Sequence, residues 1–210
     1  MLEDVLLISE KHRAAADIII QEILRRKKDK FIVAISGESG SGKSELTHVI
    51  ARKLRNYGIF AKPIHVDNFY NTLPLERADW REKSGVENVV GLKEYDWKNI
   101  NRVIDDFKHS RKSTMPCVDL VTEQVDELTT DFTGIDMLII DGLYAINIDK
   151  TDMRILIELT YRETKKSQVD RGKETDSELR WKVLEQEHKT MESIKDKATV
   201  RINKEFQVII

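Results

Sequence analysis

The sequence predicts an α/β fold in three layers, with helices on both faces of a mostly parallel, five-stranded sheet. Apolar runs that suit buried strands alternate along the chain with amphipathic helical patterns, and this alternation is typical of a parallel sheet. The first apolar run leads through a glycine-rich stretch directly into a helical pattern. The predicted strands lie at residues 31–36, 59–66, 135–140, 153–159 and 198–210.

The glycine-rich stretch has the residue types that hold the phosphates of a nucleotide. It reads Gly37, Glu38, Ser39, Gly40, Ser41, Gly42, Lys43 and Ser44. This matches the P-loop pattern G-x-x-x-x-G-K-[ST] at every position and predicts the P-loop NTPase fold. Glycines let successive N–H groups face phosphate oxygens, and the helix N-terminus adds positive potential. We expect all eight residues to bind the nucleotide, with Lys43 on the β- and γ-phosphates and the Ser44 hydroxyl on Mg²⁺.

Two carboxylates follow predicted strands. The run at 135–140 ends in Asp141, which is the Walker B pattern of a residue that holds Mg²⁺, commonly through water. The strand at 59–66 is followed by Asp67, at the edge where doubly wound sheets bind ligands. A turn or helix N-cap is the alternative for Asp67. Pro63 within that strand predicts an edge position in the sheet.

Amphipathic spacing predicts helices at residues 3–28, 97–108 and 177–195, besides the helix that follows the P-loop. Asp96 stands where the second of these helices begins, so it also suits an N-cap. His12 lies on the apolar stripe of the first helix, which favours a core or boundary position over a functional one.

Three further segments depart from the simple alternation. Residues 71–96 are polar and too long for a routine connection, which predicts a substrate loop or a partly helical cap. Two β-leaning stretches within residues 114–133 predict an inserted hairpin. Residues 161–176 carry a run of cations, which is either a solvated face or a helical lid that closes over phosphates.

Composition limits the classes of function. A chain of 210 residues suits one domain, with the first 29 residues as an N-terminal helical extension. The net charge of −2 favours neither a nucleic-acid nor a membrane partner, and no apolar stretch approaches the roughly 18–20 residues of a spanning helix. Cys117 is the only cysteine, which excludes an internal disulfide and suits a cytoplasmic setting. A small molecule is the expected partner, and a homo-oligomer is left open.

Over roughly residues 30–210, the chain resembles the uridine kinase and phosphoribulokinase family of P-loop kinases. The stretches that carry the resemblance are the P-loop, Asp67-Asn68-Phe69-Tyr70 (D-S-F-Y in the family), Tyr95-Asp96-Trp97 (F-D-H), Ile140-Asp141-Gly142 (E-G), Pro116-Cys117-Val118-Asp119 (P-x-Y-D-F) and Arg171-Gly172-Lys173 (R-G-R).

The resemblance implies the sheet order 2-3-1-4-5 and a set of roles. Asp67 would be the base that accepts the proton of the acceptor hydroxyl. Tyr70, Asp96 and Asp119 would contact the acceptor. The cations that would embrace the phosphates from the lid are Arg162, Lys166 and Arg171, the last of them catalytic.

The sequence therefore predicts a kinase that uses ATP, with GTP as the alternative, and Mg²⁺ to phosphorylate a hydroxyl of a small metabolite. By the resemblance, a nucleoside is the favoured acceptor, and pantothenate or a ribosyl compound is the alternative. Two other classes compete, an NTP-hydrolysing switch and a non-catalytic nucleotide-binding adaptor. The nearest match to the guanine-reading N-K-x-D motif of a switch, which starts at Asn203, lacks the final aspartate.

Overall fold

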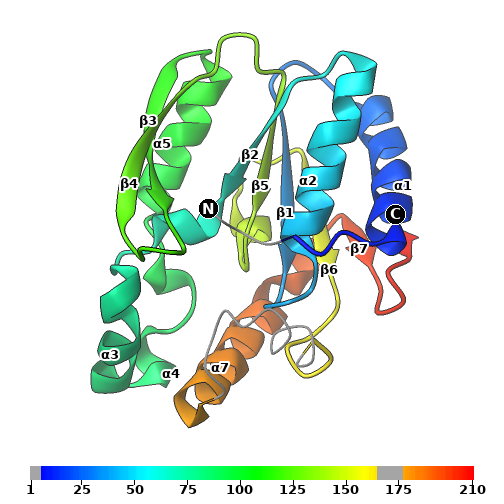
Figure 1. The fold of residues 1–210 in the computed structure, drawn as a ribbon. Helices are drawn as coiled ribbons and strands as arrows, with labels where there is room; N and C mark the ends of the chain where they lie inside the picture. Colours follow the sequence, from blue (N-terminus) through cyan, green and yellow to red (C-terminus); the bar gives the residue numbers. More distant parts are fainter. Residues whose placement is uncertain (1–5, 165–176) are drawn as a thin grey trace.

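A six-stranded sheet runs through the middle of the computed structural model, which describes residues 6–164 and 177–210 (Figure 1). The strand order is β2-β5-β1-β6-β7-β8, and every neighbouring pair is parallel except β7 and β8. The strands are β1 (Phe31–Gly37), β2 (Ala61–His65), β5 (Met137–Asp141), β6 (Met153–Ile157), β7 (Val200–Ile202) and β8 (Val208–Ile209). The five parallel strands, numbered along the chain, have the order 2-3-1-4-5, which confirms the expected topology.

The two edges of the sheet differ. β2 forms one edge, as Pro63 predicted, and an edge strand tolerates proline because its outer side has no partner strand. At the other edge the C-terminal segment forms two strands where one was expected. The turn between them is held by Asn203, whose side-chain oxygen accepts the Gln207 N–H at 2.8 Å.

Helices cover both faces of the sheet (Figure 1). One face packs against α1 (Glu10–Arg26) and α2 (Lys43–Leu54), and the other packs against α5 (Trp97–Lys108) and α7 (Glu178–Ile194). The central strands β1 and β5 are buried along their whole length. This double coverage explains why both strands are continuous apolar runs and do not alternate.

Helix α1 begins at Glu10, later than the expected start at residue 3. Ser9 precedes it as the N-cap, and His12 Nδ1 lies 3.0 Å from the Ser9 backbone nitrogen and 2.9 Å from Ser9 Oγ. These contacts satisfy polar groups at the helix start that have no partner within the helix. His12 is buried at 5% exposure, which confirms its expected core position.

Residues 71–96 form a partly helical cap, one of the two alternatives that the sequence left open. The cap contains α3 (Pro74–Ser84), which starts with proline at a position that favours it, and the short α4 (Val86–Val89). Val86 packs against Val183 of α7, so the cap rests on that helix.

The expected hairpin is present as a separate two-stranded antiparallel sheet of β3 (Lys112–Val118) and β4 (Val125–Asp131). Met115 and the following Phe132 join Phe107 of α5 in the core, so the hairpin is anchored to the face that α5 covers. Cys117 lies in β3 as a buried free thiol. Within residues 6–164 and 177–210, no helix is long and apolar enough to cross a membrane.

Candidate active site

The P-loop connects β1 to α2 at the carboxyl edge of the parallel strands. Gly40 and Gly42 have φ angles of +76° and +96°, which other residue types rarely adopt. A Cβ atom on Gly37 would stand 2.6 Å from Ser41 Oγ and 3.1 Å from the Ile157 carbonyl oxygen. The glycines therefore allow a tight turn of bare backbone at the N-terminus of α2, where N–H groups favour an anion.

The polar side chains of the loop fit a bound phosphate. Lys43 Nζ donates one hydrogen bond, of 3.0 Å, to the Glu38 carbonyl oxygen. Ser41 Oγ is buried and has no hydrogen-bond partner in the part of the chain that the structure describes. Because buried polar atoms normally have partners, this hydroxyl suits a ligand oxygen that would complete it. Ser44, half-buried in the first turn of α2, is the second hydroxyl at this helix end.

Glu38 anchors the loop to the rest of the fold, a role that the sequence pattern did not indicate. Its side chain is buried, with Oε1 2.6 Å from His188 Nδ1 of α7 and Oε2 accepting the Tyr161 N–H at 2.6 Å. The neighbouring Ser39 carbonyl accepts a hydrogen bond from Thr164 Oγ1 at 2.6 Å. The P-loop is therefore held from one side by α7 and from the other by the segment that follows β6.

Asp141 ends β5 beside the P-loop strand, where it pairs in register with Ile35 of β1. Its side chain is only 3% exposed. Oδ1 lies 2.6 Å from His65 Nδ1, whereas Oδ2 is buried and makes no hydrogen bond with the described residues. An unpaired carboxylate oxygen at the end of the strand beside β1 fits a divalent cation, which prefers oxygen ligands and their bound waters.

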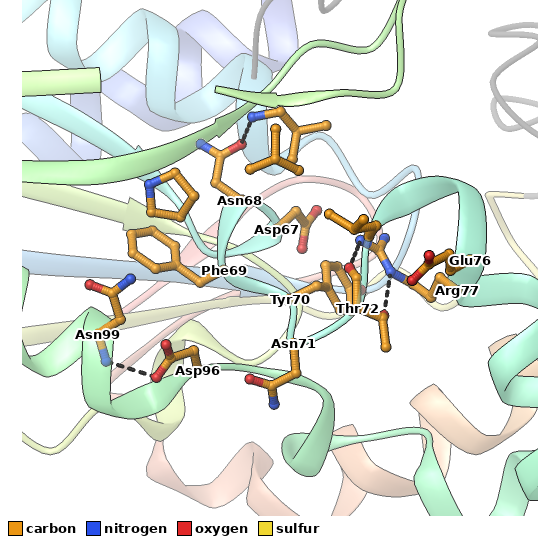
Figure 2. Close-up of a pocket in the computed structure, with 14 residues that line it drawn as sticks. Asp67, Asn68, Phe69, Tyr70, Asn71, Thr72, Glu76, Arg77, Asp96 and Asn99 are labelled. Carbon is orange, nitrogen blue, oxygen red and sulfur yellow. Dashed lines mark hydrogen bonds between the residues drawn. The ribbon is translucent and has the colours of Figure 1, made fainter. Parts of the chain in front are cut away.

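A pocket of about 240 Å³ lies just beyond the end of β2 (Figure 2). Its walls come from the short 3-10 helix Val66–Phe69, the loop that follows it, the starts of α3 and α5, and the hairpin. Asp67, Tyr70 and Asp96 all line this pocket, so three of the four predicted acceptor residues lie together.

The two aspartates of the pocket differ in what they already bind. Asp96 accepts the Asn99 N–H at 2.9 Å, which makes it the N-cap of α5. Asp67 makes no hydrogen bond or ion pair with any residue in the described ranges, and Figure 2 shows it among the labelled residues of the pocket. Its neighbour Asn68 fixes this turn by accepting the Val118 N–H at 3.1 Å. The Asp67 carboxylate is thus left available to a ligand.

Tyr70 lies against a second tyrosine and a guanidinium group. Its hydroxyl accepts a hydrogen bond of 2.7 Å from Tyr95 Oη, and the guanidinium carbon of Arg77 lies 3.5 Å from the centre of its ring. Burial, helped by the negative charge of Asp67, raises the pKa of the Tyr70 phenol well above its usual value, so the group stays neutral. Arg77 itself bonds only to Thr72, at 3.3 and 3.4 Å, and has no acidic partner among the described residues.

Buried charges connect the cap to the P-loop. Arg81 of α3 donates to Glu94 Oε1 at 2.6 Å and lies 3.8 Å from Glu187 Oε1 of α7. Arg180 also lies 3.8 Å from Glu187 and donates to Ser39 Oγ at 3.3 Å. Burial opposes the charge of Arg81, but its hydrogen bond to Glu94 and the nearby negative charges outweigh burial and raise its pKa.

Replacing Arg81 with methionine should strongly destabilise the protein. Glu94 is only 1% exposed, and removing its partner would leave a buried charge uncompensated, which typically costs about 3–5 kcal/mol. Urea unfolding would measure the loss. Lys83→Met on the same helix is the matched control, because its pair with Asp79 lies in solvent and contributes little. Equal unfolding midpoints for both variants would contradict the structural role of the buried pair.

The other predicted site residues are Asp119, Arg162, Lys166 and Arg171. Asp119 does not line the pocket, and its Oδ1 accepts the Val121 N–H at 2.8 Å in the hairpin turn, which lowers the pKa of the carboxyl. Arg162 is paired with Glu185 of α7 at 3.0 Å. Lys166 and Arg171, with the rest of the expected lid from residue 165 to residue 176, fall outside the described residues. Their roles stay predictions.

Three residues of the site were missed by sequence reasoning. His65 could have been found, because it stands two positions before Asp67 at the end of a predicted strand. Arg77 belongs to residues 71–96, for which the sequence predicted no helix bounds. The direction of the Arg77 side chain could therefore not be inferred. His188 carries no local signal, since its partner Glu38 is 150 positions away in the sequence.

A mostly parallel sheet in the order 2-3-1-4-5, with a glycine-rich loop between β1 and α2, defines the class of P-loop proteins. Within that class, the sequence model of the phosphoribulokinase / uridine kinase family matches residues 32–161. The chain therefore belongs to the phosphoribulokinase / uridine kinase family.

Individual relatives are distant. A uridine kinase of Ureaplasma parvum serovar 3 is 27% identical over 136 residues, which cover 62% of this chain and 63% of that protein. A possible uridine kinase from Bacillus stearothermophilus superposes with a TM-score of 0.66 at 21% identity, covering 90% of this chain and 97% of that one. Phosphoribulokinase from Rhodobacter spheroides superposes with a TM-score of 0.64 at 14% identity, covering 83% and 70%. These two structures share the fold.

Proposed function

We propose that this protein is an ATP-dependent kinase that phosphorylates a hydroxyl group of a small metabolite. The observation that carries the proposal is the Asp67 carboxylate, which lines a pocket and has no partner among the described residues. Asp67 follows β2, and β2 pairs directly with the strand that ends in Asp141. The carboxylates that we assign to the acceptor and to the metal therefore follow neighbouring strands, which suits phosphoryl transfer to a hydroxyl.

Each residue has a defined part in this reaction. Asp67 takes the proton of the attacking hydroxyl, whose oxygen bonds to the γ-phosphorus while the bond from that phosphorus to the β–γ bridging oxygen breaks and ADP leaves. Lys43 stabilises the negative charge that grows on the transferred group. Ser44 and Asp141 are the residues that would hold Mg²⁺, which when bound neutralises charge on the β- and γ-phosphates.

A nucleoside is the first candidate acceptor, since several relatives are uridine kinases and the pocket offers Asp96 and Asn99 side chains that suit ribose hydroxyls or amides. A second candidate is an acceptor that carries a carboxylate or phosphate, such as pantothenate or a ribosyl phosphate. Arg77 favours it, because its guanidinium lines the pocket without an acidic partner in the described ranges. Guanidinium groups bind such anions well.

Coupled measurement of ADP release would test the proposal. We expect ADP to form from ATP only when an acceptor is present, in a panel of nucleosides, ribosyl compounds and pantothenate, with GTP tested in place of ATP. Turnover without acceptor would indicate a hydrolysing switch, and no turnover with any compound would favour an adaptor. Excess EDTA should stop the reaction, and full activity in EDTA would contradict the metal roles of Ser44 and Asp141.

A further inference from the structure

Among the described residues, His65 is the side chain that forms a hydrogen bond with the carboxylate of Asp141. It is the last residue of β2 and pairs in register with Asp141, the last residue of β5. Its Nδ1 atom lies 2.6 Å from Asp141 Oδ1. The His65 side chain is 26% exposed and that of Asp141 is 3% exposed. The imidazole is therefore partly accessible to solvent, whereas the carboxylate that it contacts is buried.

The pair also lies on the side of the sheet where the P-loop helix lies. Met137 and Ile139 precede Asp141 at alternating positions of β5, and both belong to the core that α2 covers. Side chains two residues apart in a strand point to the same face. Asp141 and His65 therefore belong to the face of α2, the helix that begins with Lys43 and Ser44.

The two oxygens of Asp141 are in unequal states. Oδ1 is satisfied by His65, whereas Oδ2 is buried without a partner in residues 6–164 and 177–210. A buried acceptor without a partner is costly, so a site that retains one has a use for it. Holding Oδ1 also prevents the carboxylate from turning, and this leaves Oδ2 as the oxygen offered to a ligand.

We propose that His65 is a positioning residue for the metal carboxylate: its Nδ1–H holds Asp141 Oδ1, so that Oδ2 is presented to the Mg²⁺ of the bound nucleotide. Carboxylates that bind metals are commonly held by hydrogen bonds of this kind, and removing the partner typically costs about 10–100-fold in metal affinity or activity. The inference rests on the nucleotide site of the proposed function but not on any acceptor.

The test measures nucleotide binding without an acceptor. ATP affinity is recorded by calorimetry while Mg²⁺ is varied, with excess EDTA as the metal-free arm. For His65→Ala we expect the Mg²⁺ concentration at half-maximal binding to rise about 10–100-fold, with ATP affinity in EDTA unchanged. His109→Ala, at the exposed end of α5, is the matched control and should behave as the unmodified protein.

Two further variants separate positioning from direct contact with the metal. The amide nitrogen of asparagine falls near the place of Nδ1, whereas that of glutamine falls near Nε2. His65→Asn should therefore restore the normal Mg²⁺ dependence, and His65→Gln should resemble His65→Ala. Recovery by glutamine alone would overturn the proposal in favour of a contact through Nε2.

The remaining outcomes are equally decisive. Unchanged Mg²⁺ dependence in His65→Ala would also overturn the proposal, even if its melting temperature fell, because a structural role alone predicts that result. The asparagine and glutamine variants can be compared with each other if their melting temperatures agree. The proposal therefore remains testable even if His65→Ala folds poorly. If the unmodified protein failed to bind ATP with Mg²⁺, the proposed function would fall first and the role of His65 with it.

Discussion

Phosphoryl transfer should be lost when Lys43 is replaced with alanine, while the fold stays intact. In the part of the chain that the structure describes, Lys43 Nζ donates a hydrogen bond only to the Glu38 carbonyl oxygen of its own loop, so its removal breaks no hydrogen bond between these elements. In the reaction its charge would lie where negative charge grows on the transferred phosphoryl group. Removing one such preorganised donor typically lowers kcat by about 10²–10³-fold, and a charged donor on a phosphoryl group belongs at the upper end.

Steady-state kinetics and thermal melting of the same samples would check this expectation. Lys53→Ala is the matched control, because Lys53 lies in the same helix and pairs with Asp17 of α1, away from the loop. It should retain normal turnover. A Lys43→Ala variant with normal kcat would remove the assignment of the P-loop as the nucleotide site, whereas a variant that fails to fold would show that Lys43 has a structural role that its single hydrogen bond does not suggest.

The parallel sheet could be predicted because its physics is local. A strand buried on both faces must be apolar throughout, and the runs that became β1 and β5 have that property. The P-loop could be predicted as well, because few residue types other than glycine adopt the left-handed backbone conformation of its turn. Pro63 likewise placed β2 at an edge.

What could not be predicted depends on contacts between distant residues. Nothing in the local sequence indicates that Glu38 would meet His188, or that Arg81 would meet Glu94 and Glu187 inside the fold. The predicted start of α1 was wrong because the apolar spacing continues before Glu10, whereas Ser9, whose backbone N–H faces His12 Nδ1, is the N-cap. Such pairings arise from how helices and strands pack, and the spacing of apolar residues along the sequence does not predict them.

Only part of the acceptor site could be predicted, because the rest also depends on how distant segments pack. Asp67 was named from its place after a strand and Asp96 from the family resemblance, and both line the pocket. Asp119 was named with them by resemblance, but the hairpin turn takes up its carboxylate. Arg77, on which the proposal of an anionic acceptor rests, reaches the pocket from α3, and the sequence did not predict the bounds of that helix.

Asp67→Asn should separate a kinase from the other P-loop classes. The attacking hydroxyl must lose its proton during transfer, and a general base typically contributes about 10²–10⁴-fold in rate. Asparagine keeps the size of the side chain but lacks the basic oxygen. We therefore expect acceptor phosphorylation to fall by about 10²–10⁴-fold, while ATP binding, which we assign to the P-loop and Asp141, is retained.

The alternative for Asp67 makes the opposite prediction. A turn or cap residue would accept asparagine well, since the two residue types cap helices about equally. The structure already weakens that alternative, because Asp67 makes no hydrogen bond in the described ranges while Asp96 accepts the Asn99 N–H as an N-cap. Asp79→Asn is the control for the loss of one negative charge, because Asp79 is exposed on α3. Near-normal transfer by Asp67→Asn would remove the base assignment, and a hydrolysing or binding role would then explain the P-loop better than a kinase does.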